Sequence, residues 1–222
     1  MAVQQTEKAR FNMVQQQIRP WEVLDQRVLD IMQAVPREAF VPEAFKGLAF
    51  ADIEIPIGHD QHMMFPRVEA RMLQALSPQP DEEILEIGTG SGYITACLAR
   101  LGGQVTSLEL YHDLSEKAGE RLGGIGIENA TLQTGDAMAS DLPDGSFDVI
   151  AVTGSVPYED IALEWRSRLN PGGRMFIVVG EPPVMEATLH TRANGASFRR
   201  ESLFETLLAP LVGIPPREHF RF

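Results

Sequence analysis

The chain has few cysteines, few basic residues and no long apolar stretch, and each shortage excludes a class of protein. Its one cysteine, Cys97, excludes a disulfide within the chain, and its place on an apolar helical face predicts a buried packing residue. No uninterrupted apolar run approaches the roughly 20 residues that span a bilayer, and residues 1–17 lack the apolar core of a signal peptide. The sequence therefore predicts a cytoplasmic protein with no membrane partner.

Acidic side chains outnumber basic ones, since 31 Asp and Glu stand against 19 Lys and Arg and give a formal net charge of -12. Because nonspecific binding to nucleic acid depends on cations that neutralise phosphates, this balance argues against a nucleic-acid partner. The 222 residues, 44% hydrophobic and 23% charged, fit one large globular domain. No metal site is expected, and the sequence leaves the oligomeric state open.

The most informative stretch is residues 84–93, where a short apolar run ends in three glycines at alternate positions. An apolar helical pattern follows at once, so the stretch predicts a buried strand, a tight turn and the start of a helix. Such a turn needs glycine because its backbone angles disfavour other residues and because a ligand must approach the main chain closely. The free N–H groups at the start of the helix suit an electron-rich ligand.

The glycine spacing is G-x-G-x-G, with Glu86 two positions before the first glycine, and it differs from the dinucleotide fingerprint G-x-G-x-x-G. A carboxylate at this place is compatible with a ligand that has no pyrophosphate, and it could meet a cationic amino-acid head directly or through water. The run E-x-G-x-G-x-G resembles the first motif of the S-adenosylmethionine-dependent methyltransferases. The alternative is a glycine-rich turn in a phosphate-binding or NAD-binding fold.

Strand and helix patterns alternate on the carboxyl side of the glycines, as in a doubly wound α/β sheet. Strands are expected at 104–109, 130–134, 147–154 and 174–180, helices at 112–122 and 161–169, and a terminal antiparallel pair with its turn at Asn194-Gly195. The expected fold is a mostly parallel Rossmann-like sheet that carries an N-terminal helical cap. Residues 1–80 would form this cap and a substrate wall, and residues 81–222 the cofactor-binding core of the same domain.

The predicted cap begins with two helices in residues 5–34, separated at Arg19-Pro20 because proline cannot continue a helix. Residues 35–60 are rich in proline and predict short strands and turns. A strongly periodic helix is expected over residues 67–76. Segments of this kind before a cofactor-binding sheet commonly form a lid or a substrate wall.

Two further acids follow predicted strands and complete one expected pocket. Glu109 lies roughly 20 residues past the glycine turn, where a carboxylate can accept two hydrogen bonds from ribose hydroxyls. Asp136 follows the next strand and could accept a hydrogen bond from an adenine amino group. With Glu86 they describe a pocket for adenosine and an amino acid, which fits S-adenosyl-L-methionine. The expected cofactor-binding residues are Glu86, Gly88, Thr89, Gly90, Ser91, Gly92, Tyr93, Glu109, Leu110, Asp136, Ala137 and Thr153.

Over nearly its whole length the chain resembles the protein-L-isoaspartate O-methyltransferase family. The segments that carry this resemblance are residues 35–42, 55–58, 84–93, 147–153 and 169–174. The resemblance implies methylation of the α-carboxyl of isoaspartyl residues in damaged proteins, after which the ester collapses to a succinimide. A carboxylate is already ionised at neutral pH, so this reaction needs no general base. Alignment of the reacting atoms can supply up to about 7–11 kcal/mol of the barrier.

The chain departs from the family in residues 60–66, where the family usually reads G-Q-T-I-S-x-P or G-Q-T-M-L-S-P. Gln61 and Pro66 keep their places, but His62 stands at the threonine and Met64 lies where one variant has its serine. Gln61, His62 and Met64 are the expected catalytic residues, with His62 orienting a carboxylate or acting as a base toward a hydroxyl. The alternative interpretation assigns no catalytic role: His62 would be a surface residue of the loop, and the methionines would be packing residues.

Three functional hypotheses therefore stand beside one another. The first is isoaspartyl methylation of a peptide or protein, and the second is methylation of another acceptor, such as a small apolar acid or a phenol, by the same fold. The third is a non-catalytic module that binds S-adenosylmethionine. The loop of residues 59–66 separates them, because a pure binder has no need of polar side chains at Gln61 and His62.

Overall fold

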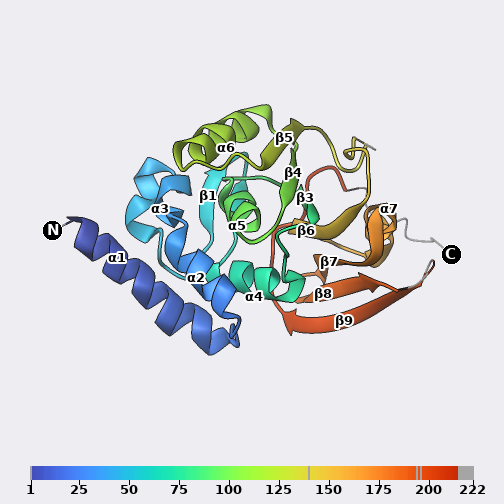
Figure 1. The fold of residues 1–222 in the computed structure, drawn as a ribbon, viewed down its shortest axis with the longest axis horizontal. Coiled ribbons are helices and arrows are strands. Elements are labelled where there is room, and N and C mark those ends of the chain that lie inside the picture. The colour runs from blue at the N-terminus through green and yellow to red at the C-terminus, as the bar shows by residue number, and fades with distance from the viewer. Residues whose placement is uncertain (1, 140, 194, 196, 215–222) are drawn as a thin grey trace.

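The structure is a computed structural model that describes residues 2–139, 141–193, 195 and 197–214 (Figure 1). A seven-stranded sheet with the order β5-β4-β3-β6-β7-β8-β9 divides the molecule, and a separate hairpin pairs β1 with β2. The strands are β1 (Ile55–Gly58), β2 (Gln61–Met63), β3 (Glu83–Ile87), β4 (Gln104–Glu109), β5 (Ala130–Thr134), β6 (Phe147–Val156), β7 (Leu169–Glu181), β8 (Val184–Arg192) and β9 (Phe198–Glu205). The α-helices are α1 (Ala2–Asn12), α2 (Gln26–Ala34), α3 (Arg37–Phe40), α4 (Pro66–Leu76), α5 (Tyr93–Leu101), α6 (His112–Gly124) and α7 (Leu163–Ser167). Tighter or wider helical turns are η1 (Met13–Ile18), η2 (Arg19–Trp21), η3 (Glu43–Leu48) and η4 (Glu159–Ala162).

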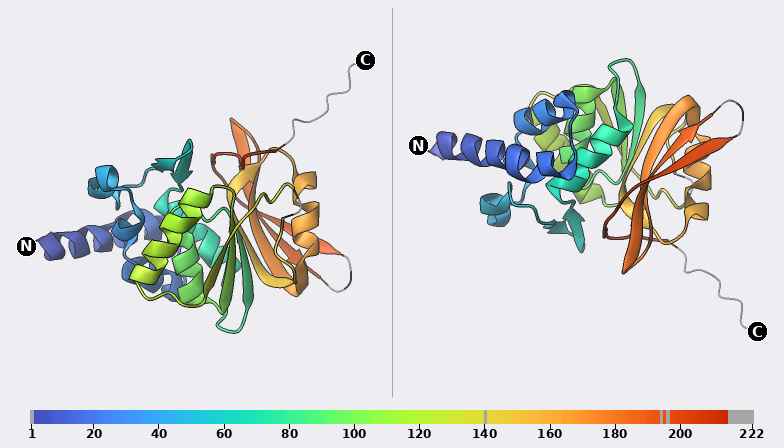
Figure 2. Two further views of the ribbon diagram at one scale, coloured as in Figure 1. Left: turned by 90° about the horizontal axis from the view of Figure 1, so that it is seen from above. Right: turned by 90° about the horizontal axis from the view of Figure 1, so that it is seen from below.

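The strand directions confirm the expected mostly parallel sheet with an antiparallel pair at its end. Strands β3 to β7 pair with one another in parallel, whereas β8 pairs antiparallel with both β7 and β9. The chain moves outward from β3 to β5 and returns to β6 on the other side of β3. Right-handed crossovers in opposite directions place their helices on opposite faces, and Figure 2 shows α7 across the sheet from α4, α5 and α6.

The central strands are buried on both faces, which explains their continuous apolar sequences. On β6, Val149 and Ala151 pack with the helices of the N-terminal side, whereas Ile150 and Val152 pack with Trp165 of α7. All five of these residues are at most 1% exposed. Because neighbouring residues of a strand point to opposite faces, a sheet covered on both sides shows no alternation of apolar and polar residues.

The predicted break in the N-terminal helix lies where it was expected. Pro20 belongs to the short turn η2, and Glu22 then adopts a left-handed conformation with φ 61 that ends the helical path. Helix α2 begins after Asp25, whose side chain accepts a hydrogen bond from the Arg27 backbone N–H at 2.9 Å. Met13 and Ile18 are fully buried, so this cap packs onto the helices that cover the sheet.

Of two expectations about the carboxyl half of the chain, one is wrong in its extent and the other involves a residue that the structure does not describe. The predicted helix over 161–169 is wrong in its extent, since α7 ends at Ser167 and β7 already begins at Leu169. The cause is burial: Leu169 is 0% exposed and pairs with Phe147 of β6, which extends the sheet through the Asn-Pro-Gly-Gly sequence. The turn predicted at Asn194-Gly195 involves Asn194, which lies outside the described residues, as do residues 215–222.

Cys97 is buried, as predicted. The boundary at residue 80 between the cap and the core stays a prediction. Within the described parts of the chain, no helix has both the length and the apolar character that crossing a bilayer requires.

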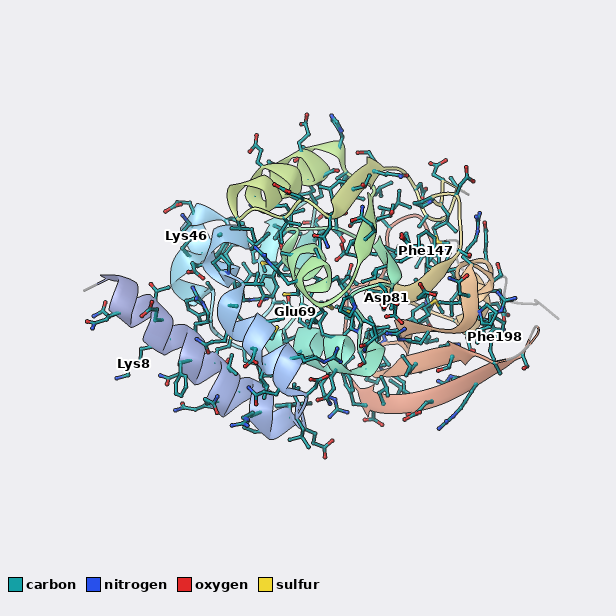
Figure 3. The ribbon with its side chains drawn as sticks, in the orientation of Figure 1. Lys8, Lys46, Glu69, Asp81, Phe147 and Phe198 are labelled. Atoms are coloured by element: carbon teal, nitrogen blue, oxygen red, sulfur yellow. The ribbon has the colours of Figure 1, made fainter. Side chains whose placement is uncertain are left out.

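A buried ion pair joins two helices of the N-terminal segment, and its arginine also contacts the start of α5 in the core. Arg37 of α3 and Glu69 of α4 are paired at 0% and 1% exposure, and Figure 3 shows Glu69 at the centre of the molecule. Arg37 also donates from Nη2 to the Met64 carbonyl at 3.0 Å, and its guanidinium lies 4.7 Å from the centroid of the Tyr93 ring. One side chain therefore holds α3, the loop before α4, α4 itself and the start of α5.

Replacing Arg37 with methionine should lower the free energy of unfolding by about 3–5 kcal/mol, because it strands a buried carboxylate without its counter-charge. Denaturation with urea at neutral pH measures this loss. The double variant Arg37→Met with Glu69→Met removes both charges and should be more stable than the single variant. Equal stability of the two variants would show that the unpaired charge is not the cause.

Candidate active site

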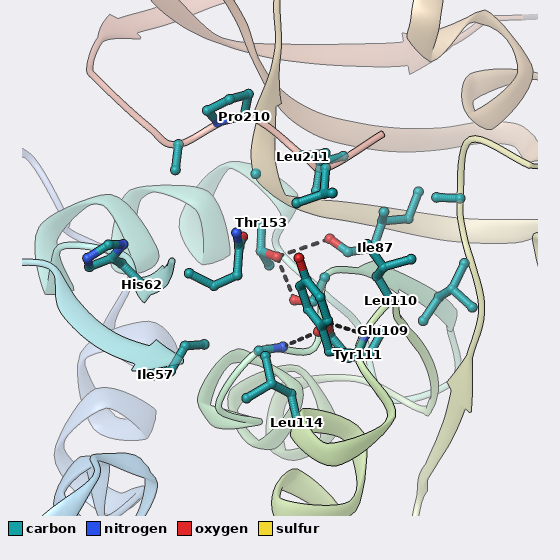
Figure 4. Close-up of a pocket in the computed structure, with 18 of the residues that line it drawn as sticks. Ile57, His62, Ile87, Glu109, Leu110, Tyr111, Leu114, Thr153, Pro210 and Leu211 are labelled. Atoms are coloured by element: carbon teal, nitrogen blue, oxygen red, sulfur yellow. Dashed lines mark hydrogen bonds between the residues drawn. The ribbon is translucent and has the colours of Figure 1, made fainter. Parts of the chain in front are cut away.

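A cavity with about 820 Å³ of space, part of it open to solvent, lies at the carboxyl ends of β3, β4 and β6 (Figure 4). This edge is the place where β3 and β6 lie side by side while their connections leave in opposite directions. Open α/β sheets bind ligands at this switch point, because the diverging loops leave a crevice there. A smaller cavity of about 320 Å³ adjoins it.

The glycine turn after β3 has a conformation that only glycine fits well. Gly88 has φ +96, and a side chain there would collide with the hydroxyl of Thr153. That hydroxyl occupies the space because it donates to the carbonyls of Ile87 and Gly88, at 3.0 and 2.5 Å. Gly90 has φ +52, and a Cβ would lie 3.1 Å from Ile57. The turn thus presents bare main chain to the cavity, as close approach of a ligand requires.

Glu109, at the end of β4, is anchored by two backbone N–H groups. Its Oε2 accepts from Gly90 at 2.8 Å and its Oε1 accepts from Tyr111 at 3.0 Å (Figure 4). A carboxylate oxygen has two lone pairs, so each oxygen keeps one acceptor position beyond these bonds. The carboxylate lines the larger cavity with its orientation set in advance, which suits a ligand with two adjacent hydroxyls.

Glu86 lies behind the glycine turn and lines neither cavity. It is 0% exposed, and its Oε2 accepts from the hydroxyls of Thr95 at 2.5 Å and Ser107 at 2.6 Å. Thr89 of the glycine turn lies 2.5 Å from the Ser107 hydroxyl, so a chain of hydroxyls joins Glu86 to the turn. Burial raises the pKa of the Glu86 carboxyl to about 8, although both hydroxyls favour its charged form.

The β1–β2 hairpin and the loop that follows it bring the expected catalytic residues to the two cavities. His62 lies opposite Pro56 in the hairpin and lines the larger and the smaller cavity. Gln61 lines the larger cavity and donates from Nε2 to the His59 carbonyl at 3.1 Å. Met64 lines the smaller one and is only 3% exposed.

The structure brings most of the expected cofactor residues to the two cavities. Those that line the larger cavity are Gly88, Gly90, Glu109, Leu110, Asp136, Ala137 and Thr153. Thr89, Ser91 and Tyr93 line the smaller one. Gly92 lines neither cavity and caps α5 with φ 87, where a Cβ would lie 3.0 Å from Ala118, so its role is close packing.

Sequence reasoning missed several lining residues, above all a segment after β9. Residues 208–212 line the larger cavity because Ser155 binds them at three points. Its backbone N–H donates to Ala209, its carbonyl accepts from Leu211, and its hydroxyl donates to Leu208, at 3.0, 2.9 and 2.8 Å. The sequence there is apolar without a clear period, so no local signal marks it.

Other missed lining residues come from the hairpin and from the start of α6. Glu54 directly precedes β1 and Ile57 belongs to it, whereas Tyr111 and Leu114 follow Glu109. Glu54 could have been found, because residues two apart on a strand share a face and Pro56 lies opposite His62. Tyr111 is the second residue past a predicted strand, a place where binding residues gather in open α/β folds.

The strand order, the glycine turn after β3 and the acid after β4 define the protein as a Rossmann-like methyltransferase. The family model of protein-L-isoaspartate(D-aspartate) O-methyltransferase matches residues 8–214, so the chain belongs to that family. Protein-L-isoaspartate O-methyltransferase 1 of Rhodopseudomonas palustris strain HaA2 is 38% identical over 205 residues, which cover 92% of this chain and 83% of the relative.

Solved structures agree on the fold. A protein-L-isoaspartate O-methyltransferase structure superposes with a TM-score of 0.77 at 22% identity and covers 94% of this chain and 66% of its own. A Plasmodium falciparum protein assigned to the same activity, solved in complex with S-adenosyl-L-homocysteine, has a TM-score of 0.75 at 20% identity. The match covers 93% of this chain and 97% of that one.

The raised pKa of Glu86 predicts a distinctive pH dependence of stability without ligand. The folded protein holds a proton that the unfolded chain releases above pH 4.5, so this group lowers the free energy of unfolding as pH rises toward 8. The slope is at most about 1.4 kcal/mol per pH unit. In Glu86→Gln it should disappear, as urea denaturation between about pH 5 and 8 would measure.

Glu83→Gln is the matched control, because Glu83 is an exposed acid on the same strand. It should keep the wild-type pH dependence. Parallel pH profiles for Glu86→Gln and the wild type would contradict the proton assigned to Glu86.

Proposed function

We propose that the protein transfers a methyl group from S-adenosyl-L-methionine to the free α-carboxyl of isoaspartyl residues in peptides or proteins. The observation that carries this proposal is the family match over residues 8–214, which includes every element that lines the two cavities. The products are the methyl ester and S-adenosyl-L-homocysteine. Membership of an enzyme family also argues against the hypothesis of a non-catalytic binding module.

The larger cavity fits the adenosine part of the cofactor. Gly88 and Gly90 leave main chain bare where a Cβ would intrude, and the anchored Glu109 carboxylate offers two acceptors for ribose hydroxyls. Asp136 holds its own loop, since its Oδ1 accepts from the Met138 N–H at 2.8 Å, and we assign it to the adenine side. We assign Thr89, Ser91 and Tyr93, which line the smaller cavity, to the amino-acid end.

The place of methyl transfer is inferred from the walls that the two cavities share. Both are lined by Ile57, His62, Gly88, Gly90 and Thr153. When bound there, S-adenosylmethionine supplies a methyl group already activated by its sulfonium. The protein has only to align an ionised carboxylate with that group and keep water away. His62 is the residue in this shared wall that can donate a hydrogen bond or a positive charge to the carboxylate, in place of the family's hydroxyls.

A second acceptor class is favoured by Glu54. This carboxylate lines the larger cavity together with His62 and directly precedes β1, the strand that pairs with the strand of His62. Its pKa is raised by burial, with His62 lowering it in part. A negative charge at this wall disfavours a second carboxylate and could hold His62 as a general base toward a hydroxyl or phenol.

The deciding experiment offers labelled S-adenosylmethionine with an isoaspartyl peptide and, separately, with its normal aspartyl twin. The first proposal expects base-labile label on the isoaspartyl peptide alone. Binding of S-adenosyl-L-homocysteine is measured by calorimetry in the same preparation. Binding without transfer to either peptide would reject the isoaspartyl acceptor and direct the search to hydroxyl and phenol acceptors.

The His62 assignment predicts a separation of turnover from cofactor binding. His62→Ala should lower kcat with the isoaspartyl peptide by about 10- to 100-fold, because a donor to the reacting carboxylate is lost. The affinity for S-adenosyl-L-homocysteine should stay within about twofold, since Glu109 and the glycine turn are untouched. His112→Ala, which removes a 73% exposed histidine side chain outside both cavities, is the control. An unchanged kcat in His62→Ala would show that His62 has no catalytic role and is only a surface residue of the loop.

A further inference from the structure

His59 makes two contacts that no part of the proposed reaction uses. It lies in the turn between β1 and β2, and its ring stacks on the ring of Tyr111 with centroids 4.0 Å apart and an interplanar angle of 12°. Its Nε2 lies 2.7 Å from Oδ1 of Asp113 on α6. The hairpin, a separate two-stranded sheet, is thus tied to the segment that follows β4.

The turn that carries His59 is held in a costly conformation. His59 and Asp60 have φ 52 and 55, so two consecutive residues with side chains adopt the left-handed region. Such residues persist where the surroundings compensate for the strain. The stack on Tyr111 and the bond to Asp113 are such a compensation, because both depend on the direction in which this turn points the imidazole.

The two partners of His59 are themselves well anchored. Asp113 also accepts from Lys117 at 2.8 Å, and these two bonds, the one from Lys117 first, lower the pKa of the Asp113 carboxyl to about 2. Tyr111 is the cap residue of α6, and its carbonyl accepts the N–H groups of Leu114 and Ser115 at 3.1 Å. His59 therefore contacts a support, formed by Tyr111 and Asp113, that is itself held in place by other contacts.

The support is also a wall of the larger cavity. Tyr111 and Leu114 line it from the α6 side, and the backbone N–H of Tyr111 holds the Glu109 carboxylate (Figure 4). Gln61 and His62 line it from the hairpin side, and Gln61 is bonded to the His59 carbonyl. The His59 contacts thus join two walls of one cavity across its rim.

We propose that His59 is a positioning residue that clasps the β1–β2 hairpin against Tyr111 and Asp113, and that this clasp must open for the cofactor or its product to leave. The inference rests on the proposed use of the larger cavity for S-adenosylmethionine. His59 acts through Tyr111, whose ring it fixes and whose backbone orients Glu109. The His59 and Asp113 side chains are 39% and 47% exposed, so water can compete for their contact and the clasp can open without unfolding the core.

The test replaces His59 with glycine, which accepts a left-handed backbone without strain and so preserves the turn. The dissociation rate of S-adenosyl-L-homocysteine, measured by stopped-flow displacement, should rise about tenfold through loss of one aromatic stack and one exposed polar contact. The KM for S-adenosylmethionine should rise while kcat with saturating cofactor does not fall, which a general loss of structure would not produce.

Asp60→Gly is the matched control, because it relieves the same left-handed strain in the neighbouring residue and leaves the His59 contacts in place. Lys117→Met is a second control that keeps the bond between His59 and Asp113. Both should release the product at the wild-type rate. The combination of His59→Gly with Asp113→Ala should be no faster than His59→Gly alone, since the two residues act through one contact.

Unchanged release in His59→Gly, or equal acceleration in Asp60→Gly, would overturn the clasp while leaving the proposed function intact. A wild-type protein that does not bind S-adenosyl-L-homocysteine would overturn both. Release that is accelerated only when His59 or Asp113 is changed supports the clasp, whatever acceptor the enzyme methylates.

Discussion

The arrangement of the active site depends on the buried guanidinium of Arg37. It pairs with Glu69, donates to the carbonyl of Met64 and lies over the Tyr93 ring. These partners belong to the helix before the first parallel strand, to the loop between β2 and α4, and to the helix that follows the glycine turn. A buried charge is tolerated only when it is paired, and these three contacts hold the cap and the core in one relative position.

Around that fixed centre, the site combines a floor of strand ends with a rim that belongs to a separate small sheet. The floor is made of strand ends, where Glu109 and Thr153 use their side chains to hold the main chain of the glycine turn. The rim is the β1–β2 hairpin, which no strand pairing joins to the main sheet among the described residues. Preorganised floors and movable rims suit alignment chemistry, because the reacting groups must be positioned accurately and the product must still leave.

The loop of residues 60–66 differs from the family's usual sequence, whereas the glycine turn after β3 keeps the expected conformation. His62 lines both cavities and Met64 lines the smaller one, and neither carries a hydroxyl. The conformation of the glycine turn is held by Glu109 and Thr153 and not by the loop, so it is compatible with either loop sequence. Under the proposed function, acceptor chemistry would depend on a few side chains of this segment, and Glu54 lines the same cavity as His62.

The sequence by itself determined the parallel sheet, the glycine turn, the break at Pro20 and the positions of Glu109 and Asp136, because each depends on a local period or on a residue's backbone preference. It could not show that Glu86 supports the turn from behind, since its contacts with Thr95 and Ser107 arise only when helix and strand pack together. The tertiary structure alone brought residues 208–212 to Ser155 and His59 to Tyr111. Such contacts join segments far apart in the chain, and they are decided by packing, for which no local pattern is a guide.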